Sequence, residues 1–432
     1  MRVLHLSTWK ERCGIADFTE SVVEHLAELG VENEVFPLDV ASLRYATSAE
    51  LLGELDRFAR RAADFDVVHV QHEFSLFTGS GGIFDTLLNF ARLLESLEAE
   101  NRPVVVTFHS GAALRSLLPV PQADQTRGGP NGAAAFLRSA ITRIRIDRAA
   151  RKLERIWRRR IAPFFDGKRR FRALVHTRRT RLEMLNSGFA PESVSVVPLG
   201  YQLRGEAFFS LDRDEARDQL GIPRDRLLLT MFGFVGAYKG HLVAVQALKK
   251  LPPNYHLAIV GGPHPLNPAD QTLNSLLEIW EGEDPARLTV SGYVSRESID
   301  LYHAATDICL APFVQGNPTG SASLSWALTS GKPTIASNIP AFAEIQRAGD
   351  CLLLCTPNAV HELAWQIQQL ARNSTLQQKL ARNALRFAAD NNWTRVADRL
   401  KDIYQEVQQA TEHSGGNVAA ATAGGGGLNW AA

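Results

Sequence analysis

Two rounds of the same alternation, in which short apolar runs are separated by helical segments, constrain the fold of this chain more than any other feature. Runs that are rich in leucine and β-branched residues and joined by helices are typical of a parallel sheet in a doubly wound α/β domain. The first round predicts strands at 2–7, 35–38, 67–71, 104–108, 173–176 and 194–198, with helices at 17–29 and 83–98. The second round predicts strands at 227–232, 255–260, 288–291, 308–311 and 333–336.

The repeated pattern divides the 432 residues into two parts, in keeping with a prior of about 150 residues per domain. We expect an N-terminal Rossmann-like domain over 1–205 and a second Rossmann-like domain over 206–389, with a polar linker near 201–224. Two such halves imply a cleft between them. The predicted fold class is therefore α/β, with two doubly wound sheets.

The C-terminal region carries two amphipathic helical patterns, at 359–389 and 393–409. We expect the helix within 390–412 to pack back on the N-terminal domain. Residues 413–432 have too little periodic apolar character to pack, so we expect a disordered tail there.

The composition is that of an ordinary globular protein, with 45% hydrophobic and 22% charged residues. Lys plus Arg (47) nearly balances Asp plus Glu (46), which argues against global attraction to nucleic acid. The four cysteines show no CxxC spacing, and three lie in apolar surroundings, which favours a reducing, cytoplasmic compartment. The first residues predict a strand and not a signal peptide, and no apolar run is long enough to span a membrane.

A basic segment lies between Arg138 and Arg172, where fourteen Lys or Arg stand against three acidic residues. Its apolar and basic residues recur at helical spacings, which favours an amphipathic basic helix. Two interpretations stay open, a solvated helix and a contact with an anionic membrane surface or polyanionic acceptor. We expect no nucleic-acid partner, because no aromatic interleaving or known binding module accompanies the charges.

The strongest functional signal is the sequence LLLTMFGFVGAYKG at 227–240. An apolar strand ends in Gly233 and Gly236, which let backbone amides approach a ligand closely. Lys239 adds a point charge where a helix start already favours anions, and Gly240 closes the motif. The motif therefore suits a diphosphate.

A second turn of the same character, NPTGSASLSWALTSGK at 317–332, leads into another helix. Its glycine and hydroxyl residues offer a second helix start that favours anions. Two such turns in one α/β half predict a nucleotide or nucleotide-sugar site.

Polar residues also follow the predicted strands of the N-terminal half. Gly14 precedes a helix, His72 and Glu73 end one strand, and His109 ends the next. A doubly wound sheet binds ligands at the carboxyl ends of its strands. Each residue alone is more often a satisfied structural group, whereas several converging on one rim favour a site.

The motifs CGIADF, DVVHVQHEF, VVVTFHSG, VSVVPLGY, FGFVGAYKG, LAIVGG, GYVSRESIDLYHAATDICLAPF and SGKPTIAS occur in this order along the chain. Together they resemble the family 4 retaining glycosyltransferases of GT-B fold, the glycosyltransferase group 1 type. The resemblance covers about 1–409. It implies that the N-terminal domain binds the acceptor and the C-terminal domain binds a nucleotide-sugar donor, with reaction in the cleft.

The resemblance also assigns roles residue by residue. His109 and Lys239 become the predicted catalytic residues, with His109 touching the transferred sugar and Lys239 holding the diphosphate. Gly14 is expected under the diphosphate, while Tyr293 and Val294 meet the base through backbone groups. The other predicted donor-binding residues are Gly233, Gly240, Gly261, Thr319, Gly320, Ser321 and Ser323. The predicted acceptor side consists of Ile15, His72 and Glu73.

Three positions depart from the family pattern. Phe234 stands where family members commonly carry an arginine, and Pro318 and Trp326 stand where they carry two glutamates. Donor recognition must then rest on Asn317, hydroxyl groups of the second turn and backbone amides.

The sequence predicts an enzyme that moves a sugar, with retention, from a nucleotide diphosphate sugar to a hydroxyl of a glycan or glycolipid. We expect a hexosyltransferase-like, metal-independent reaction without a cofactor, in polysaccharide biosynthesis at the inner face of a membrane. Two alternatives stay open: a catalytically impaired GT-B-fold scaffold or nucleotide-sugar-binding subunit, and a GT-B-like epimerase or phosphorylase. The short acidic pairs Asp64 with Asp66 and Asp212 with Asp214 are expected to cap or be solvated, not to bind metal.

Overall fold

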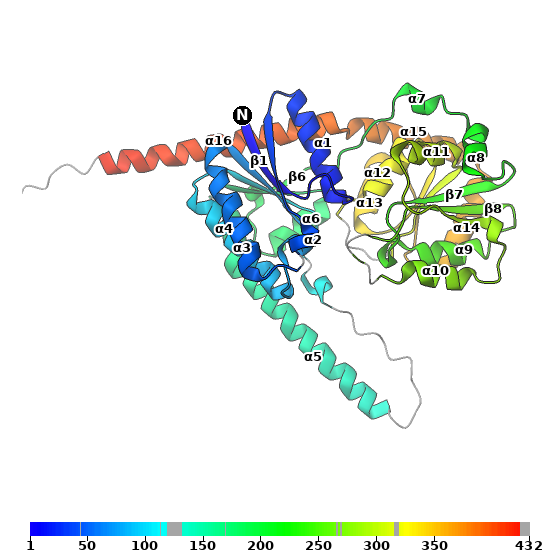
Figure 1. The fold of residues 1–432 in the computed structure, drawn as a ribbon, viewed down its shortest axis with the longest axis horizontal. Helices are drawn as coiled ribbons and strands as arrows, with labels where there is room; N and C mark the ends of the chain where they lie inside the picture. Colours follow the sequence, from blue (N-terminus) through cyan, green and yellow to red (C-terminus); the bar gives the residue numbers. More distant parts are fainter. Residues whose placement is uncertain are drawn as a thin grey trace, which may run out of the picture. The chain divides into compact units, whose positions relative to one another are not determined.

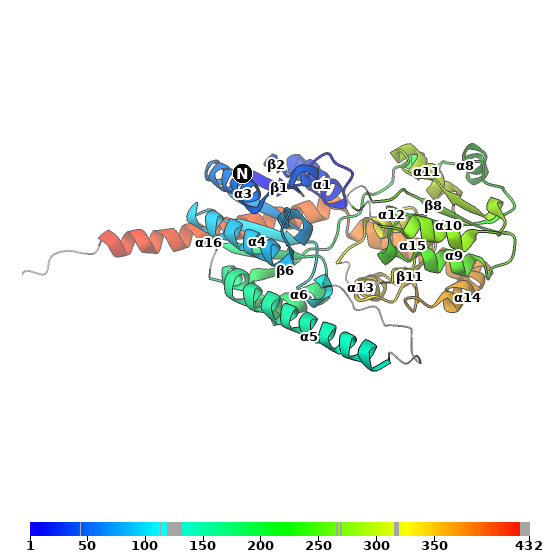
Figure 2. The ribbon, with the colours of Figure 1, turned by 60° about the horizontal axis from the view of Figure 1, so that its bottom comes forward.

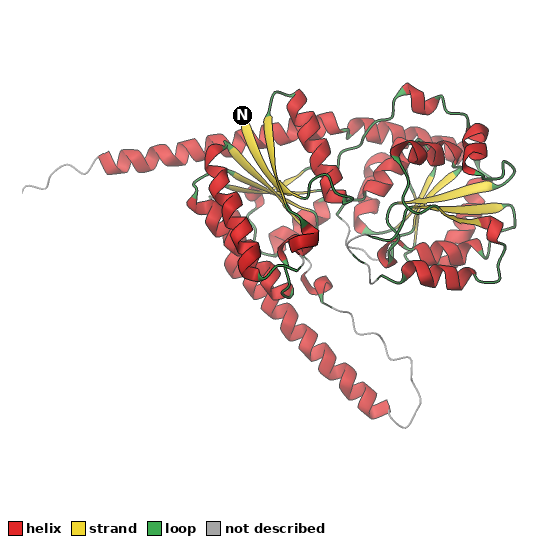
Figure 3. Cartoon of the chain, in the orientation of Figure 1, coloured by secondary structure: helices red, strands yellow, loops and turns green. Residues whose placement is uncertain are grey.

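The structure is a computed structural model that describes residues 1–43, 45–112, 114–118, 132–168, 170–264, 267, 270–314 and 319–423. The chain divides into two compact units (Figure 1). Unit 1 comprises Met1–Val197 and the residues from Ala397 on, and unit 2 comprises Pro198–Val396. Each unit is a parallel sheet covered by helices on both faces (Figure 3).

Unit 1 contains a six-stranded parallel sheet with the order β2-β1-β3-β4-β5-β6. Its strands are β1 (Arg2–Ser7), β2 (Glu32–Pro37), β3 (Val67–His72), β4 (Val104–Phe108), β5 (Phe171–Val175) and β6 (Val194–Val196). Its helices are α1 (Gly14–Glu28), α2 (Val40–Leu43), α3 (Ser48–Arg61), α4 (Ile83–Ala99), α5 (Gly132–Ile156) and α6 (Arg178–Asn186). Every residue of β3 and β4 is buried, as expected of central parallel strands with helices on both faces.

Unit 2 contains a second six-stranded parallel sheet, with the order β12-β11-β10-β7-β8-β9. Its strands are β7 (Leu227–Phe232), β8 (Tyr255–Val260), β9 (Leu288–Val290), β10 (Ile308–Ala311), β11 (Thr334–Ser337) and β12 (Leu353–Cys355). Its helices are α7 (Glu206–Phe209), α8 (Arg213–Leu220), α9 (His241–Leu248), α10 (Thr272–Trp280), α11 (Arg296–Ala305), α12 (Ala322–Thr329), α13 (Pro340–Gly349), α14 (Val360–Ala371) and α15 (Ser374–Asp390). One core cluster packs α9, α10 and α14 on the sheet, and two others lie under the helices of the opposite face.

The strand pattern is confirmed where the apolar runs are longest. The predicted strands at 2–7, 104–108, 227–232, 255–260 and 308–311 match the observed bounds residue for residue. The short edge strand β12 was not predicted. The single helix predicted at 359–389 is two helices, because Asn373 caps a new helix with its side-chain oxygen, which accepts from the Leu376 amide at 2.9 Å.

The segment expected to be a linker is instead part of unit 2. Arg217 of α8 is fully buried, and its guanidinium donates to the carbonyl of Ala305 at 3.0 Å and pairs with Asp307 at 2.7 Å. A buried guanidinium is tolerated only when its donors are satisfied, so these bonds fix α8 against α11. Arg217 therefore ties this segment to unit 2, although most of its other polar residues are exposed.

The last helix, α16 (Trp393–Ala423), begins in unit 2 and continues into unit 1. Within unit 1, Lys401 donates to the carbonyl of Leu29 at 2.8 Å and the Tyr404 hydroxyl lies 2.7 Å from His69 Nδ1. The helix runs to Ala423, so residues 413–423 are helical where we expected disorder. The four alanines near the end of this helix favour it, whereas Gly415 and Gly416 oppose it. Residues 424–432 lie outside the described residues.

The basic segment includes most of the long helix α5 and continues through two short helical turns into β5. The first half of α5 extends away from the rest of unit 1 (Figure 2). Its second half packs on the core through buried Ala150 and Leu153. Ile141 and Ile144 are about half exposed, at 48% and 49%, and exposed arginines flank them. Among the described residues, no helix combines the length and the apolar character that crossing a membrane requires.

Candidate active site

The strand order of unit 2 has a switch point between β7 and β10, and we call the space outside the carboxyl ends of these two strands the crevice. From β7 the chain proceeds to β8 on one side, while β10 lies on the other side of β7. In an open α/β sheet, ligands bind outside the carboxyl ends of the strands at such a switch point. The loops that follow β7 and β10 are therefore the candidate walls of a ligand site. These are the two loops that carry the glycine motifs.

The two loops are joined by backbone contacts. The amide of Val314 donates to the carbonyl of Tyr238 at 2.9 Å. Gly240 adopts a left-handed conformation, with φ of 78°, and a Cβ atom there would overlap the carbonyl oxygen of Pro312. Only glycine meets both conditions, so Gly240 is explained by its backbone and its approach to the second loop.

Lys239, Gly233 and Ser323 converge at this crevice. A Cβ atom on Gly233, whose φ is 93°, would overlap Lys239 Nζ and would lie 3.5 Å from Ser323 Cβ. Lys239 is only 7% exposed, and burial lowers its pKa to about 8. Within the described residues it has no ion-pair partner. A buried ammonium without a counter-ion is unfavourable, so the crevice is prepared for an anion.

The start of α12 forms the second wall. The Ser321 hydroxyl accepts from the Leu324 amide at 3.2 Å and lies 3.0 Å from the Ser323 hydroxyl. Ser321 therefore acts as an N-cap, and the other amides of the first turn have no acceptor within the helix. Such a turn attracts anions. Thr319 is buried and Gly320 partly buried, whereas Asn317 and Pro318 lie outside the described residues.

The neighbouring strand ends carry an aromatic group. Gly261 has φ of 151°, and a Cβ there would overlap the carbonyl oxygen of Gly233, so the ends of β7 and β8 touch through backbone. The Tyr293 ring lies 3.0 Å from where a Cβ of Gly262 would stand, and its hydroxyl donates to the carbonyl of Pro263. Phe234, in place of the expected arginine, lies 4.6 Å from the His264 ring and 6.3 Å from the Tyr293 ring. Val294 is partly buried against the core.

Sequence reasoning missed the environment of Trp326. The guanidinium of Arg204 lies 5.4 Å from the Trp326 ring and 5.0 Å from the Phe208 ring, and it pairs with Asp300. Trp326 is one helical turn beyond Ser323 and shares its side of α12. An arginine stacked on an aromatic ring thus occupies the neighbourhood where the family pattern has a glutamate. A lone arginine in a polar segment gives no sequence signal for this contact.

Unit 1 has its own switch point, between β1 and β3. Gly14, followed by Ile15, begins α1 after β1. A Cβ atom at Gly14 would meet no other atom within 4 Å. Glu73 follows β3, where its carboxylate accepts from the Phe74 amide at 3.0 Å and from the Ser110 hydroxyl. Burial raises the pKa of Glu73. These residues lie at the rim where the sequence predicted an acceptor side.

His72 does not lie at that rim. It is fully buried on the opposite face of β3 from Gln71, and its ring centroid is 4.3 Å from that of Phe90 and 4.8 Å from that of Phe108. Neither ring nitrogen has a hydrogen-bond partner among the described residues, and burial lowers the pKa to about 3. The structure therefore does not bring His72 to the rim where the sequence predicted the acceptor side. Strand alternation, which sends neighbouring residues to opposite faces, gives the reason.

His109 lies at the carboxyl end of β4, with both ring nitrogens near protein groups. Nε2 is 2.9 Å from Gln71 Oε1, and Nδ1 is 3.4 Å from His176 Nε2. The Phe18 ring of α1 packs edge-on against it, with centroids 5.0 Å apart. Burial lowers the pKa of His109 well below its usual value. His109 is therefore a neutral imidazole that its neighbours hold in one orientation.

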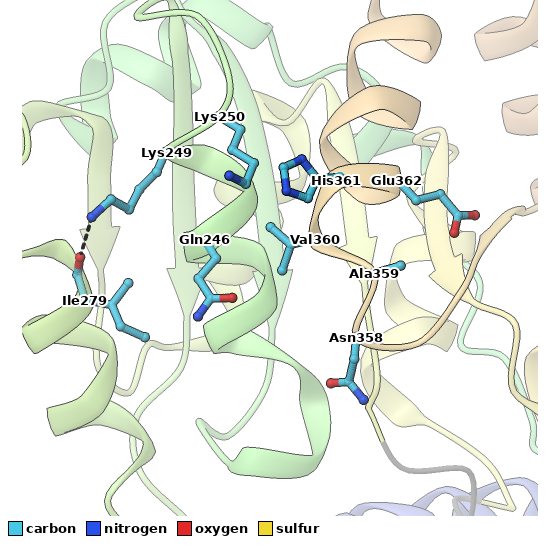
Figure 4. Close-up of a pocket in the computed structure, with 9 residues that line it drawn as sticks. All are labelled: Gln246, Lys249, Lys250, Ile279, Asn358, Ala359, Val360, His361 and Glu362. Atoms are coloured by element: carbon cyan, nitrogen blue, oxygen red, sulfur yellow. Dashed lines mark hydrogen bonds between the residues drawn. The ribbon is translucent and has the colours of Figure 1, made fainter. Parts of the chain in front are cut away.

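A separate depression of about 820 Å³ lies in unit 2, at the C-terminal end of α9 (Figure 4). Its lining residues are Gln246, Lys249, Lys250, Ile279, Asn358, Ala359, Val360, His361 and Glu362. Lys249 is engaged there, since it donates to the carbonyl of Ile279 at 3.1 Å and pairs with Glu283 at 2.9 Å. Lys239 precedes the other end of α9, so this depression and the crevice are distinct. Among the described residues, no cluster of three His, Cys, Asp or Glu is arranged to hold a metal ion.

Solved structures define the fold. The chain is similar over 94% of its length to the whole chain of Anabaena HepE in complex with UDP-glucose, with a TM-score of 0.65 and 15% identity. It is similar over 95% of its length to 99% of the sucrose-phosphate synthase chain of Thermosynechococcus elongatus, with a TM-score of 0.67 and 17% identity. At such identities the likeness shows the fold alone. The fold is GT-B, with two Rossmann-like domains, as predicted.

Sequence comparison then relates the second half of the chain to a family of enzymes. Residues 212–387 match the sequence model of the family described as Glycosyl transferases group 1. The chain is 28% identical over 227 residues to D-inositol 3-phosphate glycosyltransferase 1 of Catenulispora acidiphila, and 27% identical over 231 residues to D-inositol 3-phosphate glycosyltransferase of Stackebrandtia nassauensis. These alignments cover 51% of this chain and 53% and 50% of the relatives, so the chain spans about half the length of the curated relatives it matches. The match to the glycosyl transferases group 1 model lies within the second unit and covers less than half of the chain.

Proposed function

We propose that this protein is a retaining glycosyltransferase that moves a sugar from a nucleotide diphosphate sugar to a hydroxyl group of a glycan or glycolipid. The observation that carries the proposal is the buried ammonium of Lys239, which lies against Gly233 beside the start of α12. A switch point with a buried cation that has no ion-pair partner in the described part of the chain, beside a helix start, is suited to a diphosphate. The family match spans both walls of this crevice.

The donor is proposed to carry a nucleoside diphosphate. Structural neighbours include Anabaena HepE in complexes with UDP and with UDP-glucose. We take UDP-glucose as the first donor to test on this ground. The aromatic group of Phe234, His264 and Tyr293 would lie at the nucleoside side of the crevice, because it surrounds the ends of β8 and β9.

The chemistry follows from where negative charge develops. When the bond between the anomeric carbon and the phosphate oxygen breaks, the departing diphosphate gains charge that Lys239 and the first turn of α12 stabilise. The sugar, with oxocarbenium character, is attacked by the acceptor oxygen on the face that the diphosphate leaves. The acceptor proton passes to the departing phosphate. Neither a metal nor a cofactor is proposed, because Lys239 and the helix start supply the positive field.

The acceptor is proposed to bind at the rim of unit 1, near Gly14, Ile15 and Glu73. Glu73 has lone pairs that a sugar hydroxyl could bond, in addition to those used by Phe74 and Ser110. The free-standing half of α5 is proposed to meet an anionic membrane surface, because exposed Ile141 and Ile144 are surrounded by arginines. Both features would suit a lipid-linked acceptor.

A second candidate function is a nucleotide-sugar-binding subunit without turnover. The specific observation behind it is the contact of Arg204 with Trp326, which fills the neighbourhood of a carboxylate common in the family. Such a subunit would bind the donor and leave it intact.

Mass spectrometry of UDP-glucose incubated with the full chain separates the two. A transferase releases glucose slowly even without an acceptor, and Lys239→Ala abolishes this release. Lys250→Ala, which changes a lysine at the other end of α9, should leave the release unchanged. Tight UDP-glucose binding without release in the unmodified protein would favour the subunit over the enzyme.

A further inference from the structure

One face of the sheet in unit 1 carries a row of buried polar side chains that the proposed chemistry does not use. Gln71 shares a face of β3 with His69, and the strand register places Thr107 of β4 beside Gln71. His109 and His176 follow β4 and β5 in neighbouring positions. Tyr404 of α16 reaches the same face from the far end of the chain. We name Tyr404, His69, Gln71, His109 and His176 the histidine relay.

The proton positions at one end of the relay follow from a carbonyl group. His176 Nδ1 lies 3.0 Å from the carbonyl oxygen of Val197, which can only accept, so Nδ1 carries the proton. Burial lowers the pKa of His176 and of His109, so both rings are neutral at pH 7. A neutral His176 then has a lone pair on Nε2. His109 Nδ1, 3.4 Å away, must donate to it.

The next step fixes the amide of Gln71. Because His109 carries its proton on Nδ1, its Nε2 has a lone pair and needs a donor. In the structure the oxygen of the Gln71 amide lies 2.9 Å from His109 Nε2. Rotating the amide by half a turn brings its nitrogen to this position, where it donates an N–H to His109. Hydrogen-bond partners decide between these two amide orientations. The turned amide presents its oxygen to His69.

The other end of the relay is closed by a hydroxyl group from α16. His69 Nε2 lies 3.3 Å from the Gln71 amide and 2.8 Å from Thr107 Oγ1, both of which accept its proton in this arrangement. His69 Nδ1 is then a lone pair, and the Tyr404 hydroxyl donates to it over 2.7 Å. Every group between Tyr404 and Val197 is satisfied when all the bonds point in this one direction.

We propose that Tyr404 and Gln71 are positioning residues that hold His109 in the tautomer with its proton on Nδ1. With the bonds reversed, His176 Nδ1 would direct a lone pair at the carbonyl of Val197, unless the relay took up one proton. The relay therefore keeps the ring at the rim of unit 1 neutral and in one orientation. The effect of this on turnover rests on the proposed function, whereas the tautomer itself does not.

Nitrogen-15 spectra of the full chain labelled at histidine test the tautomer. At pH 7 the His109 signals, assigned by their loss in His109→Gln, should show a protonated Nδ1 and an unprotonated Nε2. Gln71→Glu should move the proton to Nε2, because a carboxylate only accepts. Tyr404→Phe should populate a second tautomer of both His69 and His109. A protonated Nε2 on His109 in the unmodified protein, or spectra of Tyr404→Phe identical to it, would overturn the proposal.

A matched control separates the relay from simple packing of α16. Val407 is a buried residue one turn beyond Tyr404, so Val407→Ala loosens the same helix without touching the relay. Its His109 signals should be unchanged. For UDP-glucose hydrolysis, kcat of Tyr404→Phe should fall about fivefold at unchanged KM, the worth of one hydrogen bond, and that of Val407→Ala should not. Full turnover in Tyr404→Phe would overturn the positioning role. Failure of the proposed function would show as no hydrolysis in any variant, while the spectra still decide the tautomer.

Discussion

In unit 2 the crevice between β7 and β10 is shaped by backbone, whereas in unit 1 the corresponding edge of the sheet is shaped by side chains that bond to one another. Gly233, Gly240 and Gly261 take left-handed or otherwise glycine-favouring conformations and let the loops of unit 2 touch. In unit 1, His109 belongs to a relay of polar groups, and a Cβ on Gly14 would meet nothing. The comparison teaches that the carboxyl edge of a parallel sheet can be shaped by backbone contacts in one unit and by side-chain hydrogen bonds in the other.

The largest expected effect contrasts two glycines. Gly240→Ala places a Cβ in the left-handed region and against the Pro312 carbonyl, so it should lower the free energy of unfolding by at least about 2 kcal/mol. Gly14→Ala adds a methyl group in open space at the start of a helix and should be neutral or raise stability, by up to about 1 kcal/mol. Urea unfolding of both variants measures this. Equal losses would break the distinction between the two edges.

The next effect concerns the lysine of the crevice. Lys239→Ala should weaken UDP binding by about 10- to 150-fold, the worth of a charge-assisted bond to a buried site. Because the pKa of Lys239 is about 8 in the unliganded protein, the advantage over Lys239→Ala should be constant below pH 8 and shrink as the pH rises through it. Calorimetry at pH 7 and pH 9, with Lys250→Ala as the control, provides the measurement. Unchanged UDP affinity in Lys239→Ala would show that the crevice of unit 2 does not bind the diphosphate.

The third prediction concerns His72 in unit 1, where a substitution should stabilise the protein. His72→Phe removes two unpartnered ring nitrogens from an aromatic cluster and should raise the free energy of unfolding by about 1–3 kcal/mol at pH 7. The pKa of His72 is about 3 in the folded state against 6.5 when exposed. The unmodified protein therefore loses stability as the pH falls from 6.5 towards 3, and His72→Phe should lose less.

Chemical denaturation at pH 7 and pH 5 tests this expectation. His303→Phe is a counterpart in unit 2, since His303 also has two unpartnered nitrogens among the described residues and stacks on Phe232 at 3.7 Å. A loss of stability in His72→Phe would show that the ring binds something at that position.

The smallest effect concerns α5. Arg145→Gln should weaken binding to vesicles that contain phosphatidylserine about fivefold, because a basic residue near an anionic surface contributes about 1 kcal/mol. The binding should fall with added salt. Arg382→Gln makes the same change of charge at an exposed residue of α15 in unit 2 and should have no effect. Equal binding to neutral vesicles would contradict the electrostatic account.

The sequence predicted the features that depend on a local pattern of residues. It missed those that depend on which way a side chain points or on contacts between residues far apart in the chain. The glycines of unit 2 could be found because an apolar run followed by spaced glycines specifies a turn whatever surrounds it. His72 was misplaced because adjacent strand residues face opposite sides, and a motif does not say which side meets the rim. The contacts of Arg204 with Trp326 and of Tyr404 with His69 join residues far apart in the chain, so no local pattern marks them.

The bond between Val314 and Tyr238, together with the close approach of Gly240 to Pro312, has a consequence for engineering. The loops after β7 and β10 are held together by these contacts, so an insertion in either loop would displace the other. A library intended to redirect sugar preference should therefore vary positions 234 and 321–326 together while retaining the glycine and the proline. The same coupling applies when new sugar specificity evolves in unit 2. We therefore expect related sequences of different specificity to differ in both loops together.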